Sequence, residues 1–364
     1  MRHSPLLLCL LILALAGVVA CGPAAAPTQA SPPPVSAPAP KPVHAAPPLS
    51  AVRFVSAQEG WAAGQGAILH SADGGKTWTQ QYSSDATIAA LAFADATHGW
   101  AVAQDRLLRT TDGGQSWQAA GEPKDSALAG VEFTSASQGW GVASGTLYQS
   151  GDGGNTWSKV TTQGRVDSTC FADASNGWAA GGSWVLRTTD AGHTWKPTWR
   201  APVEGEEWHA TIHCNSASTA WVLLQGSAMM SQQSYVAFRS TDGGAHWGAL
   251  ARESYFSSAY PSVTVEAQID AYAGPFATTD PATAYFLGSC PACDMSVSLT
   301  TTTDGGKTLR YDKIAALAGS MGTALTFADA RHGWLVSGKG DQGLILATAD
   351  GGQTWQQVLP APAQ

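Results

Sequence analysis

The chain has few charged residues: they make up 13% of its 364 residues, and the formal net charge is −8 at pH 7. A nucleic-acid-binding protein needs a basic stripe that releases counterions from the phosphate backbone, so this balance argues against that class of partner. After the apolar run at the amino terminus, no second long apolar segment follows that could cross a membrane. The nine histidines form no HExxH motif, and the EF-hand pattern is missing, so we expect neither a metal site nor a cofactor.

Glycine and tryptophan are abundant instead, with 40 and 15 residues. One short pattern, Ser/Thr-x-Asp-x-Gly-x-Thr-Trp in loose form, occurs seven times, first at Ser71–Trp78 and last at Thr348–Trp355. An Asp before Gly-Gly suits a tight turn with positive φ, and its carboxylate can accept N–H groups of that turn. We therefore interpret seven aspartates as structural turn residues, not as catalytic or metal-binding groups: Asp73, Asp112, Asp152, Asp190, Asp242, Asp304 and Asp350.

A second pattern, Phe-x6-Trp, accompanies the Asp turns. It begins at Phe54, Phe93, Phe133, Phe171 and Phe327, with degenerate copies at Cys214 to Trp221 and Thr278 to Tyr285. Each unit then reads as four short strands. Seven such units in series predict an all-β fold, a seven-bladed β-propeller of four-stranded blades over residues 49–364.

The spacing of the aspartates lengthens after Asp190, which places insertions at 196–212, 226–237, 250–279 and 288–297. All four connections belong to the propeller face opposite the Asp turns. Variable loops on a rigid scaffold commonly carry function, so we expect the binding face there. Its candidate residues are Arg200, Glu204, Glu206, Glu207, Trp208, Tyr235, Tyr255 and Tyr260. Two alternatives stay open: the acids could form a glycosidase pair, and the tyrosines could pack the loops onto the propeller.

The amino terminus resembles an export signal. Residues 1–20 carry Arg2 before an apolar run that ends in Val-Val-Ala-Cys21, which is similar to a bacterial lipoprotein signal. We expect Cys21 to be lipidated and residues 21–48, rich in Pro and Ala, to form an extended tether. The protein would then be exported and lipid-anchored to the cell membrane on its extracytoplasmic side. An ordinary cleaved signal with an incidental Cys is the alternative.

Four further cysteines are expected to be oxidised in an exported protein. Cys290 and Cys293 are best interpreted as a local structural disulfide, since nothing nearby suggests the βαβ context of a redox CxxC motif. Cys170 and Cys214 lie at or beside the first strands of neighbouring units, so a bridge between blades is possible there.

The Asp turns resemble the Asp-box, or BNR, repeats of sialidases and related propellers. The additional Phe-x-x-Ala-x-x-Gly-Trp element, at Phe93–Trp100 and Phe171–Trp178, is similar to photosystem II assembly factors of the Ycf48/HCF136 type. The resemblance implies a non-catalytic, membrane-associated factor that binds photosystem II reaction-centre polypeptides. Photosynthetic members carry an Arg-rich patch, whereas the arginines here are scattered.

From the resemblance and the residues together we expect a non-catalytic, monomeric assembly factor. Its partner would be a membrane protein or another envelope protein. The alternatives are an exo-sialidase-like glycoside hydrolase and an extracellular lipoprotein that binds glycans or peptides.

Overall fold

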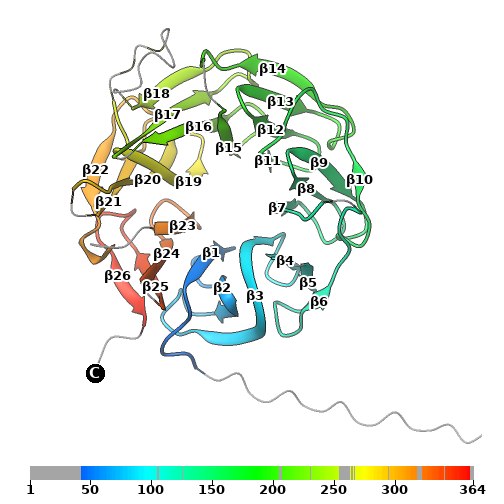
Figure 1. Ribbon diagram of the computed structural model, residues 1–364, viewed down its shortest axis with the longest axis vertical. Helices are drawn as coiled ribbons and strands as arrows, with labels where there is room; N and C mark the ends of the chain where they lie inside the picture. Colours follow the sequence, from blue (N-terminus) through cyan, green and yellow to red (C-terminus); the bar gives the residue numbers. More distant parts are fainter. Residues whose placement is uncertain are drawn as a thin grey trace, which may run out of the picture. The chain divides into compact units, whose positions relative to one another are not determined.

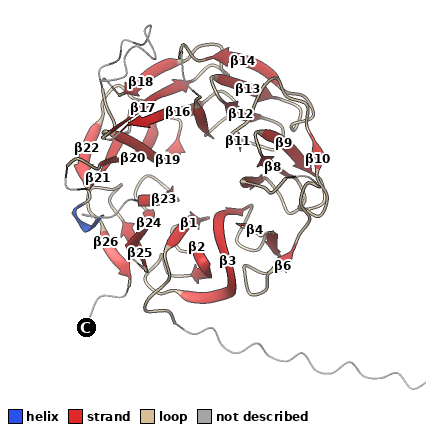
Figure 2. Ribbon diagram, viewed as in Figure 1, coloured by secondary structure: helices blue, strands red, loops and turns tan. Residues whose placement is uncertain are grey.

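The computed structural model describes residues 42–104, 106–124, 126–204, 207–229, 231–253, 263, 265, 267–293, 295–317, 322–339 and 341–360. These residues belong to a unit that runs from Pro40 to Gln364. Within it, antiparallel β-sheets stand around a ring like the blades of a propeller, and a short 3-10 helix, η2 (Ala315–Leu317), lies beside them (Figures 1 and 2). Among the described residues, no helix is long and apolar enough to cross a membrane.

The strands follow one another around the ring in chain order (Figure 1). The first sheet contains β1 (Leu49–Phe54), β2 (Gly60–Ser71), β3 (Thr79–Phe93), β4 (Gly99–Ala103), β5 (Leu107–Thr110) and β6 (Gln118–Ala119). The next two contain β7 (Gly130–Phe133), β8 (Gly139–Ala143), β9 (Thr146–Ser150) and β10 (Ser158–Lys159), then β11 (Ser168–Phe171), β12 (Gly177–Gly181), β13 (Trp184–Thr188) and β14 (Lys196–Arg200). The fourth contains β15 (His209–Cys214), β16 (Ala220–Met229), β17 (Gln232–Ser240) and β18 (Gly248–Arg252). The last two contain β19 (Tyr272–Asp280), β20 (Thr283–Cys290), β21 (Ser296–Thr302) and β22 (Arg310–Lys313), then β23 (Gly322–Phe327), β24 (Gly333–Lys339), β25 (Gln342–Thr348) and β26 (Gln356–Leu359).

The prediction of seven four-stranded blades is wrong, because hydrogen bonding joins the described strands into six sheets, five of four strands and a first of six. The cause is β3, a single strand of 15 residues. Its residues 79–87 pair with β2, and its residues 88–93 pair with β4. No loop separates the last strand of the first repeat from the first strand of the second. Two repeats, with the turns of Asp73 and Asp112, therefore share one sheet.

Aromatic stacking joins most neighbouring repeats. Trp100 of β4 stacks on Phe133 of β7 with ring centroids 3.5 Å apart and planes 2° from parallel. Equivalent stacks pair Trp61 with Phe93, Trp140 with Phe171, and Tyr285 with Phe327. Such pairs bury large apolar surfaces and add about 0.5–1.5 kcal/mol beyond the area term. The Phe-x6-Trp pattern therefore encodes the contact between repeats, because the Trp of one repeat packs on the Phe of the next.

The same contact closes the ring. Trp334 of β24 stacks on Phe54 of β1 at 3.5 Å, and its indole N–H donates to the carbonyl of Gly74 at 3.0 Å. The hydroxyl of Thr323 donates to the carbonyl of Leu49 at 2.9 Å. In the described residues each sheet is built from consecutive strands, so closure takes place by packing and hydrogen bonding between the first and last sheets.

The end of the expected tether is part of the folded unit. The N–H of Val43 donates to the carbonyl of Trp78 at 2.8 Å, and the carbonyl of Ala46 accepts from Gly343 at 2.8 Å. Ala46 itself is buried. Residues 42–48 therefore bridge the first and last sheets, because their backbone pairs with both.

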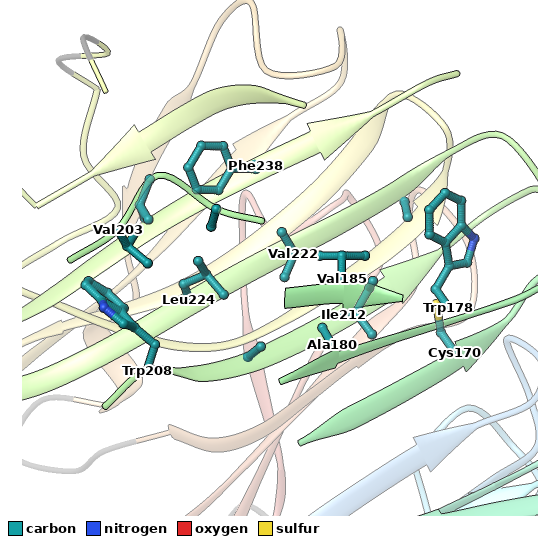
Figure 3. Close-up of a cluster of buried hydrophobic side chains, with 14 of the residues drawn as sticks. Cys170, Trp178, Ala180, Val185, Val203, Trp208, Ile212, Val222, Leu224 and Phe238 are labelled. Atoms are coloured by element: carbon teal, nitrogen blue, oxygen red, sulfur yellow. The ribbon is translucent and has the colours of Figure 1, made fainter. Parts of the chain in front are cut away.

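The core between the third and fourth sheets supports the loops described below. Val185, Val222, Leu224 and Phe238 are buried there, together with Val203 and Trp208 from the connection that joins β14 to β15 (Figure 3). Apolar residues of a connecting segment thus enter the core, and that segment is held in place by burial.

Candidate binding face

Each Asp turn is closed by its own side chains. Asp112 Oδ1 accepts from Thr110 Oγ1 at 2.8 Å and from the N–H of Ser116 at 2.9 Å, and Oδ2 accepts from Ser116 Oγ at 2.6 Å. Thr110 Oγ1 also accepts from the N–H of Gly114 at 2.8 Å. Gly113 and Gly114 have φ of 72° and 86°, values that suit glycine. Matching Asp bonds recur at the other six turns.

These hydrogen bonds stabilise the charged carboxylate. At Asp190 the hydroxyl and N–H of Thr194 and the hydroxyl of Thr188 lower the pKa to about 2. Both oxygens of each turn aspartate are engaged inside the turn. Among the described residues, no group of three or more His, Cys, Asp or Glu side chains is placed to hold a metal ion. The geometry therefore assigns these aspartates to the backbone of the turn.

A pocket on the opposite face collects four of the expected binding residues. It has a volume of about 520 Å³ and lies between the turn that joins β12 to β13 and the connection from β14 to β15. Its lining consists of Arg165, Gly181, Gly182, Ser183, Trp184, Arg200, Val203, Glu204, Glu207 and Trp208. We refer to it as the loop-face pocket.

The connection that forms one wall of this pocket alternates buried and exposed residues. Val203 and Trp208 are buried in the core, whereas Glu204 and Glu207 are exposed (Figure 3). The two buried side chains fix the segment, so the two carboxylates stand at defined places on the rim. Trp208, expected as a contact residue, thus contributes mainly by packing.

Arg165 occupies another wall and is held by a network of polar side chains. Its Nε donates to Asp167 Oδ1 at 2.5 Å, and its Nη1 donates to Glu207 Oε1 at 2.8 Å. Asp167 is fixed in turn, because its Oδ2 accepts from the N–H groups of Gly182 and Ala210 at 3.1 and 3.0 Å. The guanidinium is therefore oriented before any ligand arrives, which lowers the entropic cost of binding.

The floor of the pocket combines a cation with an aromatic ring. The guanidinium carbon of Arg200 lies 5.5 Å from the centroid of Trp184, within the range of a cation–π interaction. Arg200 Nε also approaches Ser183 Oγ at 3.5 Å. An aromatic face beside two arginines and two carboxylates suits the charged groups and flat peptide bonds of a polypeptide segment.

The pocket is poorly suited to acid–base catalysis. The side chain of Glu207 is 78% exposed and already accepts from Arg165. A general acid in a glycosidase is typically a carboxyl shielded from water, whereas Glu207 stands exposed on the rim.

Tyr235 does not lie on the binding surface where we expected it. The residue is fully buried, and its hydroxyl accepts from the N–H of Ile269 at 2.8 Å and donates to the carbonyl of Asp270 at 2.8 Å. It anchors the segment before β19 because these backbone groups need partners in the interior. Four other candidates lie outside the described residues: Cys21, Glu206, Tyr255 and Tyr260.

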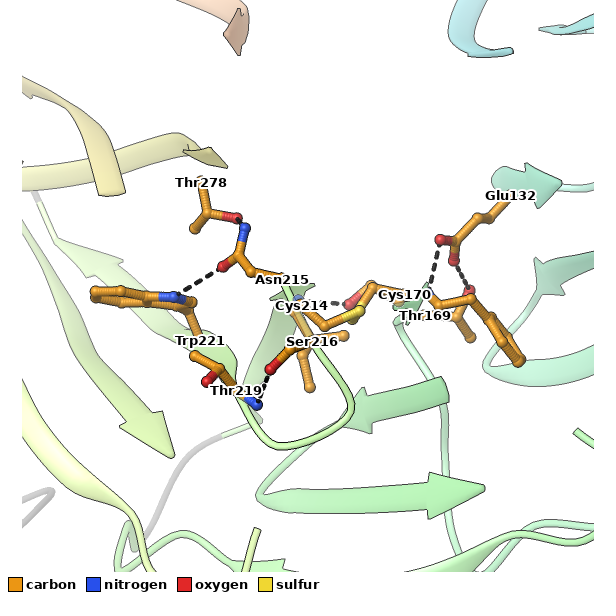
Figure 4. The surroundings of a disulfide bond; sticks show 12 residues. Glu132, Thr169, Cys170, Cys214, Asn215, Ser216, Thr219, Trp221 and Thr278 are labelled. Atoms are coloured by element: carbon orange, nitrogen blue, oxygen red, sulfur yellow. Dashed lines mark hydrogen bonds between the residues drawn. A yellow bond between two sulfur atoms is a disulfide. The ribbon is translucent and has the colours of Figure 1, made fainter. Parts of the chain in front are cut away.

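Two disulfides are present among the described residues. Cys290, the last residue of β20, is joined to Cys293 in the connection between β20 and β21. Cys170 and Cys214 are also joined, and their bond links β11 to β15 across neighbouring sheets (Figure 4). Cys214 stands where regular repeats have the Phe that stacks on the preceding Trp, so a covalent link joins the two sheets where this stack is missing.

Sequence reasoning missed Arg165, Asp167 and Trp184 as pocket residues. Trp184 follows Gly181-Gly182-Ser183, the tight turn between β12 and β13, and this turn faces the same side as the long connections. A tryptophan directly after a short turn on that face was the available signal. Arg165 had none, since its role depends on the side chain of Glu207, 42 residues further along the chain.

The comparisons with known proteins agree with the Ycf48 resemblance. Residues 79–168, about a quarter of the chain, match the sequence model of the family described as photosynthesis system II assembly factor YCF48. A structure described as YCF48 bound to D1 peptide is similar, with 18% identity, a TM-score of 0.58, and coverage of 84% of this chain and 94% of that one. YCF48 from Cyanidioschyzon merolae gives 16% identity, a TM-score of 0.57, and coverage of 84% and 97%. The predicted resemblance to a Ycf48-like β-propeller is thus confirmed.

An enzyme shares the fold as well. The GH74 xyloglucanase from Xanthomonas campestris is 16% identical with a TM-score of 0.62, and the match covers 87% of this chain and 55% of that one. At these identities the structural likenesses show the fold alone. No curated protein sequence matches the chain.

Proposed function

We propose that this chain is a non-catalytic assembly factor that holds a polypeptide segment of a membrane or envelope protein in the loop-face pocket. The observation that carries the proposal is the preformed pair of arginines: Arg165 is fixed by Asp167 and Glu207, and Arg200 lies over Trp184. The Ycf48 match supports a role in binding, since one similar structure is described as bound to D1 peptide. The protein acts as a monomer in this proposal.

The proposal places the protein at a membrane surface. Cys21 carries the lipid, and the Pro- and Ala-rich residues after it span the distance to the propeller on the extracytoplasmic side. Val-Val-Ala-Cys21 after a single apolar run supports this placement.

Crosslinking in the native membrane tests the function. The full chain is expressed as wild type, as Arg200→Ala and as Lys307→Ala, and the crosslinked partners are quantified by mass spectrometry. Lys307 is the matched control, because it is an exposed cation in an Asp turn on the other face. We expect one membrane or envelope polypeptide to be enriched by wild type and Lys307→Ala, and about tenfold less by Arg200→Ala.

Equal recovery by all three proteins would contradict the proposed pocket. A fluorogenic sialoside assay addresses the enzyme alternative. Clear turnover that disappears in Arg200→Ala would overturn the non-catalytic assignment.

A further inference from the structure

The innermost strand of each repeat carries one equivalent residue. It directly precedes the first position of the Phe-x6-Trp pattern, which we call the Phe position. On each of these strands, the residue just before the Phe position pairs with the aromatic residue of the following strand: Arg53 with Trp61, Ala92 with Trp100, Glu132 with Trp140, Cys170 with Trp178, His213 with Trp221, Ala277 with Tyr285, and Thr326 with Trp334. Successive residues of a strand face opposite sides, so when the Phe position packs between repeats this residue faces away from that contact. We call these seven residues the axial layer. The strands that carry them surround the centre of the ring in Figure 1.

Five members of the axial layer line a central pocket of about 550 Å³: Arg53, Ala92, Glu132, Cys170 and His213. The same position holds Ala, Cys or Thr in the other four repeats, so the fold does not require an ionisable group there. Three ionisable side chains nevertheless occur at this level. Their presence is independent of the loop-face pocket and of the proposed function.

Two of these three side chains have unused hydrogen-bonding groups. Within the described part of the chain, the guanidinium of Arg53 and the ring nitrogens of His213 make no hydrogen bond or ion pair. Glu132 is different: its Oε1 accepts from the N–H of Phe171 at 2.8 Å and its Oε2 accepts from Thr169 Oγ1 at 3.2 Å (Figure 4). Arg53 lines the pocket and its side chain is exposed to solvent there. Its guanidinium therefore presents five N–H donors to the pocket.

The surroundings favour neutral forms of Glu132 and His213. Burial raises the pKa of Glu132 to about 7, against the hydrogen bonds from Phe171 and Thr169 and the charge of Arg53. Burial, with Arg53 as a second cause, lowers the pKa of His213 to about 4. Asp173 is the remaining titratable residue in the lining, and its hydrogen bonds to Ser175 and Asn176 hold its pKa below the usual value. Near neutral pH, Glu132 is thus the group whose charge changes.

We propose that the central pocket binds a carboxylate group of a ligand against Arg53, and that one proton is taken up with it. The guanidinium offers the paired donors that a carboxylate accepts. A second anion near Glu132 is unfavourable while Glu132 is charged, so the ligand draws a proton onto Glu132 and both carboxyl groups are accommodated. The carboxylate belongs either to the C terminus of a peptide or to a small free acid.

Calorimetry on the full chain in detergent micelles tests this proposal. The probes are acetyl-triglycine with a free carboxylate, the same peptide as its C-terminal amide, and N-acetylglycine. We expect the free-acid peptide to bind about tenfold or more tightly at about pH 6 than at about pH 8.5, because uptake of one proton costs a factor of ten per pH unit above the pKa. The amide should not bind. Equal binding of N-acetylglycine identifies a small acid as sufficient, and binding of the peptide alone identifies a peptide terminus.

Variants separate the two parts of the proposal. Arg53→Met should abolish binding, and Lys307→Met, which removes an exposed cation from an Asp turn, should leave it unchanged. Glu132→Gln should bind with equal affinity at both pH values. If Glu132→Gln fails to fold, proton uptake by the wild type is measured in two buffers of different ionisation enthalpy. One proton per ligand supports the proposal, and none overturns it. Binding of the amide, unchanged binding by Arg53→Met, or no binding of either acid probe to the folded wild type would also overturn it.

Discussion

The two faces of the propeller use similar residues for different purposes. On the Asp-turn face, acids, hydroxyls and glycines recur seven times, and each Asp is satisfied by hydrogen bonds inside its own turn, as at Asp112. On the loop face, Glu204 and Glu207 stand on a rim that occurs once, beside Arg165 and Arg200. A carboxylate whose two oxygens are both hydrogen-bonded within its turn is less available to a partner. The comparison teaches that repetition marks architecture here, whereas departure from the repeat marks the candidate site.

The largest effect should come from the stack that underlies the Asp-turn face. Phe133→Ala removes the ring on which Trp100 packs, and the indole of Trp100 donates to the carbonyl of Gly153 in the next Asp turn at 2.9 Å. We expect the free energy of unfolding to fall by about 3–5 kcal/mol, the usual cost of removing a buried Phe side chain. Urea unfolding measures it. A loss below about 1 kcal/mol would show that the stacks do not hold the repeats together.

A single Asp turn should matter less. Asp112→Asn removes a charged acceptor of three hydrogen bonds, and we expect a loss of about 1–3 kcal/mol with partner capture unchanged. Asp85→Asn, in β3 and outside the Asp turns, is the control. Lost capture by Asp112→Asn at an intact melting temperature would reverse the assignment of the two faces.

The loop-face pocket should show the opposite result. Trp184→Ala removes the ring beneath Arg200, and we expect partner binding to weaken about tenfold, or about 1.4 kcal/mol, while the melting temperature stays close to that of the wild type. Affinity is measured by titration with the polypeptide recovered by crosslinking. Loss of folding and binding together would assign Trp184 to the core instead.

The last effect concerns the pH dependence of stability. The folded-state pKa of Glu132 is raised to about 7 from its ordinary 4.5, so the stability conferred by its neutral form is present at low pH and lost as the pH rises through about 7. The turn aspartates have lowered pKa values, so their contribution is lost as the pH falls instead, through about 2 at Asp190. His213, with a pKa lowered to about 4, adds stability that is lost as the pH falls from about 6.5.

We therefore expect the wild type to lose about 1–2 kcal/mol of stability between about pH 5 and pH 8, and Glu132→Gln to lack this loss. The energy is reduced because solvent in the pocket screens the charge. Thermal unfolding at several pH values measures it. A wild-type and variant pair with parallel pH profiles would show that Glu132 titrates normally.

The sequence predicted the repeat and the chemistry of its turns, because these depend on residues a few positions apart. Asp112 and Ser116 lie in one turn, so their spacing alone indicates their contact. The number of sheets could not be obtained in this way, since it depends on β3 continuing from one repeat into the next without a loop. Tyr235 was misplaced because burial is set by residues 269 and 270, which lie more than thirty positions away.

The candidate site was predicted only in part, because some of its contacts join residues that are far apart in the sequence. The connection from β14 to β15 was identifiable as an insertion, and Arg200, Glu204 and Glu207 do line one pocket. Arg165, Asp167 and Trp184 come from other elements and meet the connection only in the folded ring. The sequence does show ionisable residues before three of the Phe positions. They could not be interpreted as one pocket until the structure placed the innermost strands around a common centre.

The most direct test of the difference between the faces is hydrogen–deuterium exchange on the full chain with and without its crosslink-identified partner. We predict slower exchange on binding at residues 181–184 and 207–209 and unchanged exchange at the Asp turns. Protection confined to the Asp turns, with the loop face unchanged, would contradict the account.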